Sequence, residues 1–352
     1  MKVGLVCPYD MGAHGGVQDQ VIRLSRWLTD VGHEAIVIAP GTSDVEGFVS
    51  AGPATVVPAN GATTPIALSA GAAAAVLGAL EDVDVAHIHE PLMPRVSLTA
   101  LRKATVPMVG TFHADTSALA QRVYQVGKPL TSRWFRHLDV ITAVSPIAAR
   151  VVEDTGRVRI IPNGVDIEMY SPVEKVPGSV VFLGRNDERK GLPVLLAAWP
   201  EIRKTHPQAT LTVVGAEQPG GAVPGVGFVG RVSEEAKRQH LSEASVYCAP
   251  NLSGESFGIV VVEGMAAGCA VVASGLPAFV RVAGDAALFA APGDGAGLAD
   301  QITRLLSDAD LASSLSAAAM ERAKLFSGES VATDYITAYE DAVAAHHTRP
   351  VR

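Results

Sequence analysis

Short apolar runs alternate with longer amphipathic stretches along this chain, which is the pattern of repeated strand–helix–strand units. The pattern stops after the first half and then begins again. It therefore predicts two α/β regions, each with a parallel sheet. The predicted strands are Val3–Val6, Ala35–Ala39, Val85–Ile88, Pro107–Thr111, Val140–Val144 and Val158–Ile161 in the first half, and Val180–Leu183, Thr210–Val214, Val226–Phe228, Val246–Ala249 and Ala270–Ala273 in the second.

The helix after the first strand has the clearest periodicity. Apolar residues recur in it at intervals of four and three, which predicts one buried face, and Gly32 ends it. The periodic residues of this first helix are Val17, Val21, Leu24, Leu28 and Val31.

A final helix is predicted from about Glu329 to His346, and the sequence does not decide which half it packs against.

The stretch Asp166–Gly178 contains two prolines and lacks periodicity, so it is predicted to be a linker. The 352 residues suffice for two domains of ordinary size. We expect two Rossmann-like domains, residues 1–169 and 170–330, that face each other across a deep cleft. The C-terminal helix, about residues 331–352, is left open between the two domains, and packing back on the first domain is one of the two alternatives.

The composition is that of a globular protein, with 48% hydrophobic and 18% charged residues. A net charge of −8 argues against wholesale nucleic-acid binding. Cys7, Cys248 and Cys269 are scattered, which fits a reducing compartment and does not suggest a zinc site. The N-terminus predicts a strand rather than a signal peptide, and the apolar stretch Ala67–Leu80 is too short to cross a bilayer. We expect a soluble, cytoplasmic protein.

The segment Gly254–Gly268 carries the strongest chemical signal, because Glu255 and Glu263 lie eight residues apart in it. If a helix begins near Ser256, Glu255 lies in the preceding loop and Glu263 about two turns inside. Unpaired N–H groups and the dipole at that helix start suit a phosphate. Glu255 would then accept hydrogen bonds from neutral hydroxyls and Glu263 from a ribose. The arrangement suits a sugar nucleotide.

Two further loops follow predicted strands and are candidates for binding phosphate. Gly15 and Gly16 allow a phosphate to approach the backbone closely, although their spacing is not that of a dinucleotide fingerprint. A tight turn without a ligand is the alternative. The loop Gly184–Gly191 contains two or three cations, among them Arg185 and Lys190, that would neutralise a diphosphate leaving group without a metal. Its alternative is a solvated charged loop.

His113 ends the strand Val-Gly-Thr-Phe-His, and Asp115 follows two residues later. Strand ends of this kind point into the ligand crevice of α/β sheets. A histidine there would bind a sugar hydroxyl or transfer a proton, and a partly buried structural histidine is the alternative. His87 and His89 lie within an apolar strand and are predicted to be structural.

Taken together, these motifs resemble those of the retaining glycosyltransferases of family 4, which have the two-domain GT-B fold. The resemblance covers nearly the whole chain. Within the family it is strongest to an actinobacterial branch that transfers mannose from GDP-mannose to phosphatidylinositol. The family motifs are Gly15-Gly16-Val17, Thr111-Phe112-His113, Ile161–Asp166, Phe182–Arg185 and Glu255–Glu263; those of the branch are Val246–Pro250, Gly254–Val260 and Met265–Gly268.

The resemblance implies a role for each candidate residue. Arg185 and Lys190 would stabilise the departing β-phosphate, and this electrostatic stabilisation would supply much of the catalysis. Glu255 and His113 would contact the transferred sugar. No cofactor is implied, and donor binding is expected to be independent of metal. The remaining assignments are Gly15, Gly16, Ser256, Phe257, Gly258, Ile259 and Glu263 to the donor, with Glu263 at the ribose, Val232 and Lys237 to guanine, and Tyr9 and Asp115 to the acceptor.

The chain departs from that branch where the acceptor lipid would bind. The branch carries a basic amphipathic helix that binds anionic lipid, but the corresponding stretch Ser69–Leu80 here has no basic residue. A lysine expected to meet the inositol phosphate is Ala118. Residues 119–137 do keep a basic tract with Trp134 and Phe135 and no acid, which either touches a membrane or, as we favour, is a solvated helix face. Its bases are Arg122, Lys128, Arg133 and Arg136.

The leading prediction is a GDP-mannose-dependent retaining mannosyltransferase with a phosphatidylinositol-type acceptor. The alternative is a soluble glycosyltransferase that acts on a small cyclitol or sugar, with GDP-mannose or another nucleotide sugar as donor. A nicotinamide dehydrogenase is disfavoured because its fingerprint is missing. The expected partners are a nucleotide-sugar donor and a hydroxyl acceptor, without nucleic acid and with at most peripheral contact at the inner face of the plasma membrane.

Overall fold

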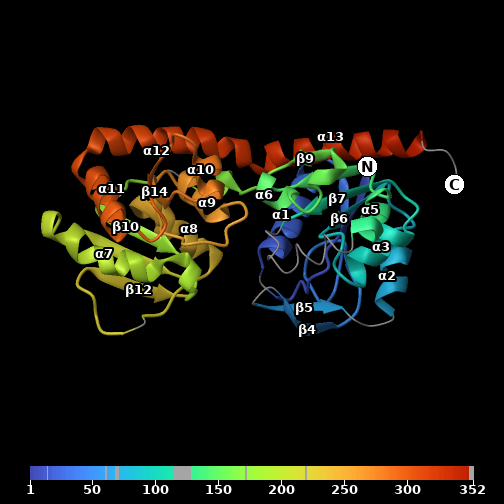
Figure 1. Ribbon diagram of the computed structural model, residues 1–352, viewed down its shortest axis with the longest axis horizontal. Coiled ribbons are helices and arrows are strands. Elements are labelled where there is room, and N and C mark those ends of the chain that lie inside the picture. The colour runs from blue at the N-terminus through green and yellow to red at the C-terminus, as the bar shows by residue number, and fades with distance from the viewer. Residues whose placement is uncertain are drawn as a thin grey trace. The chain divides into compact units, whose positions relative to one another are not determined.

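The computed structural model describes residues 1–13, 15–59, 62–67, 71–113, 128–170, 173–218 and 220–348 of the chain (Figure 1). The chain divides into two compact units. Unit 1 comprises Met1–Gly164 together with Gly328–Arg352, and unit 2 comprises Val165–Ser327. The C-terminal segment that begins at Gly328 therefore belongs to the N-terminal unit.

Unit 1 is built on a parallel sheet in the order β3-β2-β1-β6-β7-β8-β9. Each strand predicted in the first half is present, with ends shifted by no more than one residue. The mostly apolar and buried residues of β1, β2, β7 and β8 explain this agreement, because both faces of the sheet are covered there. The strands are β1 (Lys2–Val6), β2 (Glu34–Ala39), β3 (Phe48–Ser50), β6 (Val85–His89), β7 (Met108–Phe112), β8 (Val140–Ala143) and β9 (Val158–Ile160).

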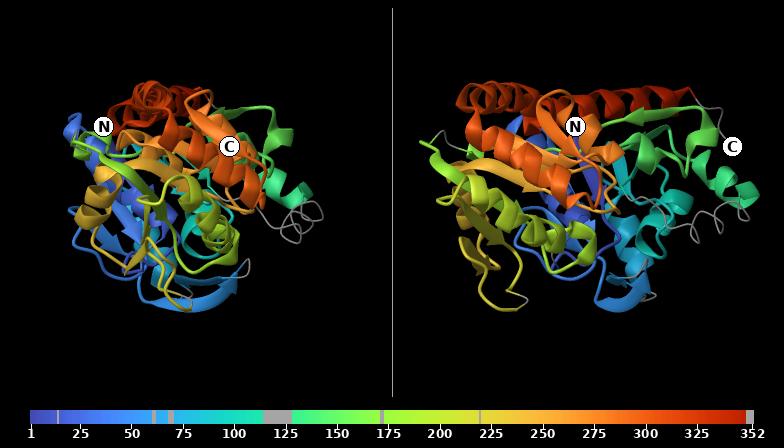
Figure 2. Two further views of the ribbon diagram at one scale, coloured as in Figure 1. Left: turned by 90° about the vertical axis from the view of Figure 1, so that its left-hand side faces the viewer. Right: turned by 60° about the vertical axis from the view of Figure 1, so that its left-hand side comes forward.

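The structure adds three strands to the prediction in this unit. One is the edge strand β3, and the other two are β4 (Ala54–Ala59) and β5 (Ala62–Ala67), which form an antiparallel hairpin away from the main sheet (Figures 1 and 2). Each hairpin strand contains a proline, Pro58 or Pro65, which interrupts the usual sequence pattern of a strand. The pattern therefore gave no signal for them.

Two helices, α1 and α13, complete the core of unit 1. α1 (Gly16–Asp30) buries Val21, Leu24 and Leu28 as predicted, and Gly32 takes a φ of 87° just after its end. α13 (Gly328–His347) packs against the same core through residues such as Tyr339. The other segments are α2 (Gly71–Ala79), α3 (Val96–Lys103), α5 (Lys128–Phe135), α6 (Pro146–Ala149) and the 3₁₀ turn η1 (Glu153–Thr155).

Unit 2 contains a second parallel sheet, in the order β12-β11-β10-β13-β14-β15. All five predicted strands are present, but β10 begins within the stretch predicted to be a linker. The four-residue strand β15 was not predicted. The strands are β10 (Val176–Leu183), β11 (Thr210–Val214), β12 (Val226–Gly230), β13 (Ala244–Ala249), β14 (Ala270–Ser274) and β15 (Ala287–Ala290).

The helices of unit 2 alternate with its strands, as the βαβ pattern predicts. No helix in the described part of the chain is long and apolar enough to cross a membrane. The helical segments are α7 (Leu192–Thr205), α8 (Glu234–Glu243), α9 (Ile259–Ala266), α10 (Pro277–Ala283), α11 (Gly295–Ser307), α12 (Ala309–Ala323) and the 3₁₀ turns η2 (Ile167–Met169), η3 (Glu188–Lys190) and η4 (Lys324–Phe326).

The predicted start of α9 near Ser256 is wrong, because the helix begins three residues later, at Ile259. Gly258 precedes it with a φ of 106°, a left-handed conformation that interrupts a helix. A side chain there would also clash, since a Cβ atom would lie 2.9 Å from the Phe279 ring. Glu263 is thus the fifth residue of the helix, little more than one turn from its start.

Candidate active site

Two loops of unit 2 meet beside its sheet and carry several of the predicted donor ligands. One follows β10 and includes Lys190; the other follows β13, the strand that pairs with β10, and includes Glu255. The Leu252 N–H donates to the Arg189 carbonyl at 2.7 Å. Gly191 adopts a φ of 72°, and a Cβ atom there would lie 1.9 Å from the Pro250 carbonyl oxygen. Glycine therefore permits the close contact that aligns the two loops.

Glu255 is held by two hydrogen bonds that converge on one of its oxygens. Lys190 Nζ lies 3.0 Å from Oε2, and Asn251 Nδ2 donates to the same atom at 2.7 Å. The other oxygen, Oε1, receives no hydrogen bond from a residue that the structure describes. The carboxylate is therefore fixed in place with one oxygen available to neutral hydroxyls.

The charged loop offers fewer free cations than its sequence suggests. Arg189 pairs with Asp187, with Nη2 and Oδ2 2.6 Å apart, and this hydrogen bond lowers the pKa of Asp187 to about 2. Arg185 is exposed, and no ion pair joins it to any described acid. Arg185 therefore remains unpaired among the described residues, whereas Lys190 pairs with Glu255, and the role of both at a diphosphate stays a prediction.

Glu263 and Lys237, predicted to bind the ribose and the base, are joined to each other. Their Oε1 and Nζ atoms lie 2.9 Å apart in a largely buried pair, and Lys237 also pairs with Glu234. Burial lowers the pKa of Lys237, but the two carboxylates outweigh it, so the pKa is raised overall. Ser233 caps α8, and Lys237 lies in the first turn of that helix. Val232 directly precedes the cap and is half-buried.

The start of α9 presents backbone rather than side-chain groups. Gly258, at the N-cap, has no side chain to satisfy the first N–H groups, so a phosphate suits this position. Ile259 and Ser256 are half-buried around it. Phe257 is 5% exposed and packs edge-on against Phe326, with ring centroids 5.7 Å apart. Phe257 can therefore reach a ligand only through its backbone.

The glycine loop of unit 1 leaves its backbone open. Gly15 is the extended N-cap of α1, where a Cβ atom would lie 2.4 Å from Gln18 Oε1, whereas a Cβ atom of Gly16 would meet no atom within 4 Å beyond its chain neighbours and its own helix backbone. A phosphate could approach this backbone without a steric barrier. Tyr9 is half-buried in the same loop after β1. Asp115, the other predicted acceptor residue, lies outside the described residues, as does Ala118.

His113 lies just beyond β7 and is only 7% exposed. Its Nε2 is 2.8 Å from His89 Nδ1, and its backbone N–H donates to Glu90 Oε1 at 2.7 Å. Burial lowers the pKa of His113 to about 4, although a hydrogen bond with Asn163 opposes the shift. The ring is therefore neutral near pH 7 and can exchange hydrogen bonds without carrying charge.

His87 has a different environment from its neighbour His89. Its Nδ1 lies 2.8 Å from the Tyr339 hydroxyl and its Nε2 2.6 Å from Thr111 Oγ1, so both ring nitrogens are used. These contacts tie the sheet to α13 and support a structural role.

Sequence reasoning missed Glu90 and Asn251 as members of the site. Asn251 follows β13 directly, and its position at a strand end was an available signal.

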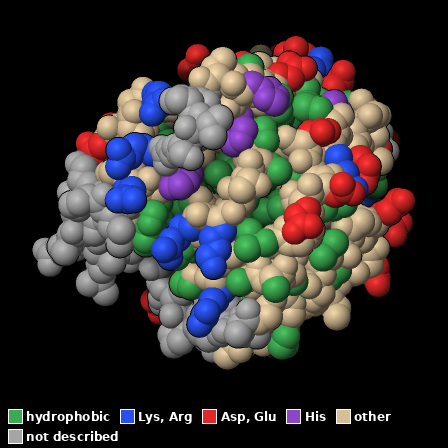
Figure 3. All heavy atoms as spheres, turned by 90° about the vertical axis from the view of Figure 1, so that its right-hand side faces the viewer, with side chains coloured by type: hydrophobic (Ala, Val, Ile, Leu, Met, Phe, Trp, Pro, Cys, Tyr) green, Lys and Arg blue, Asp and Glu red, His purple; other side chains and the backbone are tan. Residues whose placement is uncertain are grey.

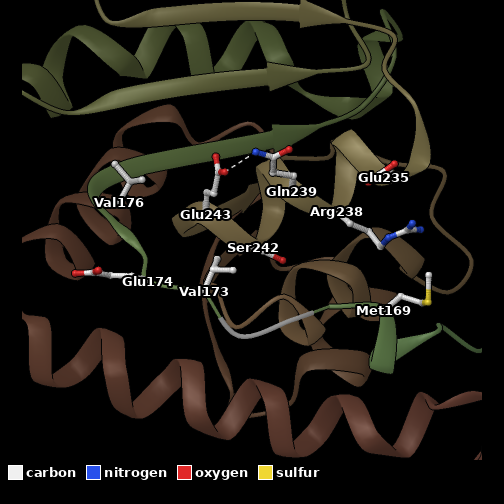
Figure 4. Close-up of a pocket in the computed structure, with 9 residues that line it drawn as sticks. All are labelled: Met169, Val173, Glu174, Val176, Glu235, Arg238, Gln239, Ser242 and Glu243. Atoms are coloured by element: carbon white, nitrogen blue, oxygen red, sulfur yellow. Dashed lines mark hydrogen bonds between the residues drawn. The ribbon is translucent and has the colours of Figure 1, made fainter.

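A surface hollow of about 770 Å³ in unit 2 contains none of the candidate residues (Figure 4). The α8 side chains that line it follow i, i+3, i+4, i+7 spacing from Glu235 to Ser242, which places them on one face of the helix. Lys237 occupies a different face. The hollow and the pair of glutamates are therefore separate features.

Family models match both halves of the chain. Residues 14–169 match the model described as Glycosyltransferase Family 4, and residues 177–308 match the model described as Glycosyl transferases group 1. Among curated relatives, a phosphatidyl-myo-inositol mannosyltransferase of Mycolicibacterium smegmatis is 38% identical across 98% of this chain and 95% of that protein. One of Propionibacterium freudenreichii is 37% identical across 81% of this chain and 80% of its own length.

Two solved structures show the same fold as this chain. Sucrose-phosphate synthase from Thermosynechococcus elongatus superposes with a TM-score of 0.73 at 23% identity, over 98% of this chain and all of that one. HepE from Anabaena, solved in complex with UDP, gives a TM-score of 0.72 at 17% identity, over 97% of this chain and all of its own. The predicted fold of two Rossmann-like domains is confirmed.

Proposed function

The chain belongs to glycosyltransferase family 4, and we propose that it transfers mannose from GDP-mannose to a phosphatidylinositol-type lipid with retention of configuration. The relatives that are 38% identical over nearly the full length are named phosphatidyl-myo-inositol mannosyltransferases, which supports the mannosyl group and the lipid acceptor. The observation that carries the proposal is the fixed Glu255 carboxylate beside Lys190 and Asn251. This arrangement combines an acceptor for sugar hydroxyls with a cation for the departing phosphate.

In this proposal unit 2 binds the donor. Arg185 and Lys190 stabilise the negative charge that develops on the diphosphate as the sugar C1–O bond breaks. Oε1 of Glu255 accepts hydrogen bonds from the sugar hydroxyls, which orients the sugar. Glu263 binds the ribose, held in position by Lys237. The positive charges of Arg185 and Lys190 neutralise the diphosphate, which a metal ion does in other transferases. Donor binding is therefore proposed to be independent of metal.

The acceptor is proposed to bind to unit 1, near Tyr9 and His113. A second candidate function is favoured by one observation: α2 (Gly71–Ala79) contains no charged residue, whereas the lipid-specific branch has a basic helix at this place. An enzyme of the same family that glycosylates a soluble cyclitol or sugar would not need such a helix. The donor chemistry is the same in both cases, so only the acceptor distinguishes them.

For a lipid acceptor, we propose peripheral contact with the inner face of the plasma membrane through α3 and α5. The exposed bases there are Arg102 and Lys103 on one helix and Arg133 and Arg136 at the end of the other, and Arg102 lies 5.4 Å from the Trp134 ring. α3 and α5 lie on the right-hand side of Figure 1, and Figure 3 shows the molecule from that side. Lys, Arg and His side chains gather over one part of this face. Such a surface suits anionic lipid.

Two titrations followed by an acceptor screen test the proposal. GDP and UDP are titrated separately into the protein, and donor turnover is then measured with phosphatidylinositol and with free inositol. Tighter binding of GDP and turnover only with the lipid support the leading proposal. Turnover with inositol alone would favour the soluble-acceptor enzyme, and tight UDP binding without a GDP response would contradict the mannosyltransferase proposal.

A further inference from the structure

His113 is held from the neighbouring strand by two consecutive residues, His89 and Glu90. His89 Nδ1 meets the His113 ring at 2.8 Å, and Glu90 Oε1 accepts the His113 backbone N–H at 2.7 Å. β6 and β7 are adjacent, with His89 opposite Thr111 in the register. The contacts therefore cross between the carboxyl ends of two paired strands, the edge where ligands bind in open α/β sheets.

Glu90 adopts an unusual backbone conformation to make its contact. Its φ is 47°, and among the described non-glycine residues only Arg95, in the same loop, also has a positive φ. This region is unfavourable for residues with a side chain, and such strain persists mainly where the surroundings impose it, often at functional sites. Here the strained residue directs its carboxylate at the main chain of His113.

His89 makes no other ring hydrogen bond within the described part of the chain. Its Nε2 is buried without a partner, which is a costly state for a polar atom. His87 lies beside it with ring centroids 4.1 Å apart but uses both its nitrogens elsewhere. The one hydrogen bond of the His89 ring goes to His113. This bond best explains why a histidine with a buried, unpartnered nitrogen occupies the position.

The bond couples the states of the two rings. Burial holds the pKa of His89 well below its usual value and that of His113 at about 4, so both are neutral near pH 7. Between two neutral imidazoles one nitrogen donates and the other accepts, so the position of the proton on His89 dictates its position on His113. The side chain of Asn163 also hydrogen-bonds with His113, and the titratable groups that contact the pair are His87, beside the His89 ring, and Glu90.

We propose that His89 and Glu90 are positioning residues that fix the tautomer and the orientation of the His113 ring toward the transferred sugar. This inference rests on the proposed function, which gives His113 its contact with that sugar. His89 sets which ring nitrogen carries the proton, and Glu90 sets where the backbone of His113 lies.

Kinetics of matched variants test whether His89 acts through His113. His89→Asn keeps a polar atom at the position of Nδ1 and is expected to stay near the parent, whereas His89→Leu is expected to lower kcat about tenfold or more with little change in the donor KM. Adding His89→Leu to His113→Leu should cause no further loss. A double variant in which the two losses multiply would overturn the proposal.

His87→Leu and two Glu90 variants serve as controls. His87 is as deeply buried as His89 but does not contact His113, so its variant should lose stability while keeping the parent kcat. Glu90→Gln retains an acceptor for the His113 N–H and Glu90→Ala does not, so only the second should lose activity. Equal losses in His87→Leu and His89→Leu would show a structural role alone and contradict the inference.

A spectroscopic measurement separates this inference from the proposed function. ¹⁵N-detected NMR of the histidine rings should show one tautomer for His113 in the parent and in His89→Asn, and a different or mixed state in His89→Leu. A parent that transfers no sugar would contradict the proposed function and leave this readout intact. An unchanged His113 tautomer in His89→Leu would overturn the inference whatever the activity.

Discussion

Glu255 is the residue on which the donor chemistry depends most directly. The change Glu255→Gln keeps the shape of the side chain but removes its charge, so it weakens both the hydrogen bonds to sugar hydroxyls and the pairing with Lys190. We expect kcat to fall about 100-fold or more. Affinity for the nucleoside diphosphate should change little, because the sugar is absent from that ligand.

Steady-state turnover and isothermal titration with GDP measure the two effects. Glu201→Gln is a suitable control, since Glu201 is an exposed acid on α7 that pairs with Lys204 three residues further along the helix. It should match the parent in both measurements. Unchanged turnover in Glu255→Gln would refute the role given to this carboxylate.

The buried histidines of unit 1 predict a loss of stability in acid. His87, His89 and His113 all have a pKa lowered from 6.5 by burial. As the pH falls from about 6.5 toward 4, the unfolded chain binds protons at these positions and the folded chain does not. The free energy of unfolding should therefore fall by about 1.4 kcal/mol per pH unit for each histidine.

Urea denaturation at several pH values measures this slope. The variant His87→Asn removes one of the three groups and should make the slope below pH 6.5 shallower by about one histidine's share. A variant with the same slope as the parent would show that His87 is not the neutral, buried group described here.

At the scale of single residues, sequence reasoning succeeded where strand ends are regular. It placed His113 at a strand end, Lys190 in the loop after a strand and Glu255 in the loop ahead of a helix, and each lies there in the structure, although that helix begins later than predicted. It did not find that Lys237 and Glu263 pair, because their contact depends on how α8 and α9 pack. Glu90 was also missed, since a strained φ leaves no mark in the sequence.

At the scale of elements, the pair Lys237–Glu263 links α8 to α9 and should stabilise unit 2. The change Lys237→Met leaves Glu263 as a buried carboxylate that has lost its lysine. We expect the free energy of unfolding to fall by about 3 kcal/mol. The double variant Lys237→Met/Glu263→Leu should recover much of this loss, since an apolar pair replaces the charges.

Urea denaturation measures these changes, with the exposed pair Lys324–Glu321 as the control. Lys324→Met should alter the free energy of unfolding by less than about 1 kcal/mol. If Lys237→Met were equally mild, the pair would have no structural importance and would be available entirely for ligand binding.

Strands and long helices were predictable because apolar runs and a period of 3.6 residues are properties of the sequence itself. Elements that depend on special backbone geometry were not. The left-handed Gly258 delays the start of α9, and the proline-containing β4–β5 hairpin lacks the usual pattern of a strand. The return of α13 to unit 1 is likewise a matter of packing.

At the scale of the whole molecule, the distribution of charge bears on the acceptor. Residues 91–138 contain seven lysines and arginines and one acid, in a chain with a net charge of −8. We expect the protein to cosediment with vesicles of phosphatidylglycerol and phosphatidylcholine but not with phosphatidylcholine alone. Arg133→Glu/Arg136→Glu should weaken this binding at least tenfold, since each base near an anionic surface contributes about 1 kcal/mol.

The control variant Arg157→Glu/Arg304→Glu makes the same change in net charge at exposed positions that belong to neither α3 nor α5. It should bind vesicles more tightly than the first variant. No binding by the parent would support the solvated helix face favoured from the sequence, and with it a soluble acceptor.

The proposed reaction of this family 4 glycosyltransferase moves mannose from GDP-mannose to phosphatidylinositol. The most direct test measures GDP release and lipid product together, with purified protein, GDP-mannose and phosphatidylinositol vesicles. We predict one mannosyl lipid for each GDP released, with the α-configuration of the donor retained, and little GDP release without the lipid. GDP release that is the same with and without phosphatidylinositol, and no mannosyl lipid, would contradict it.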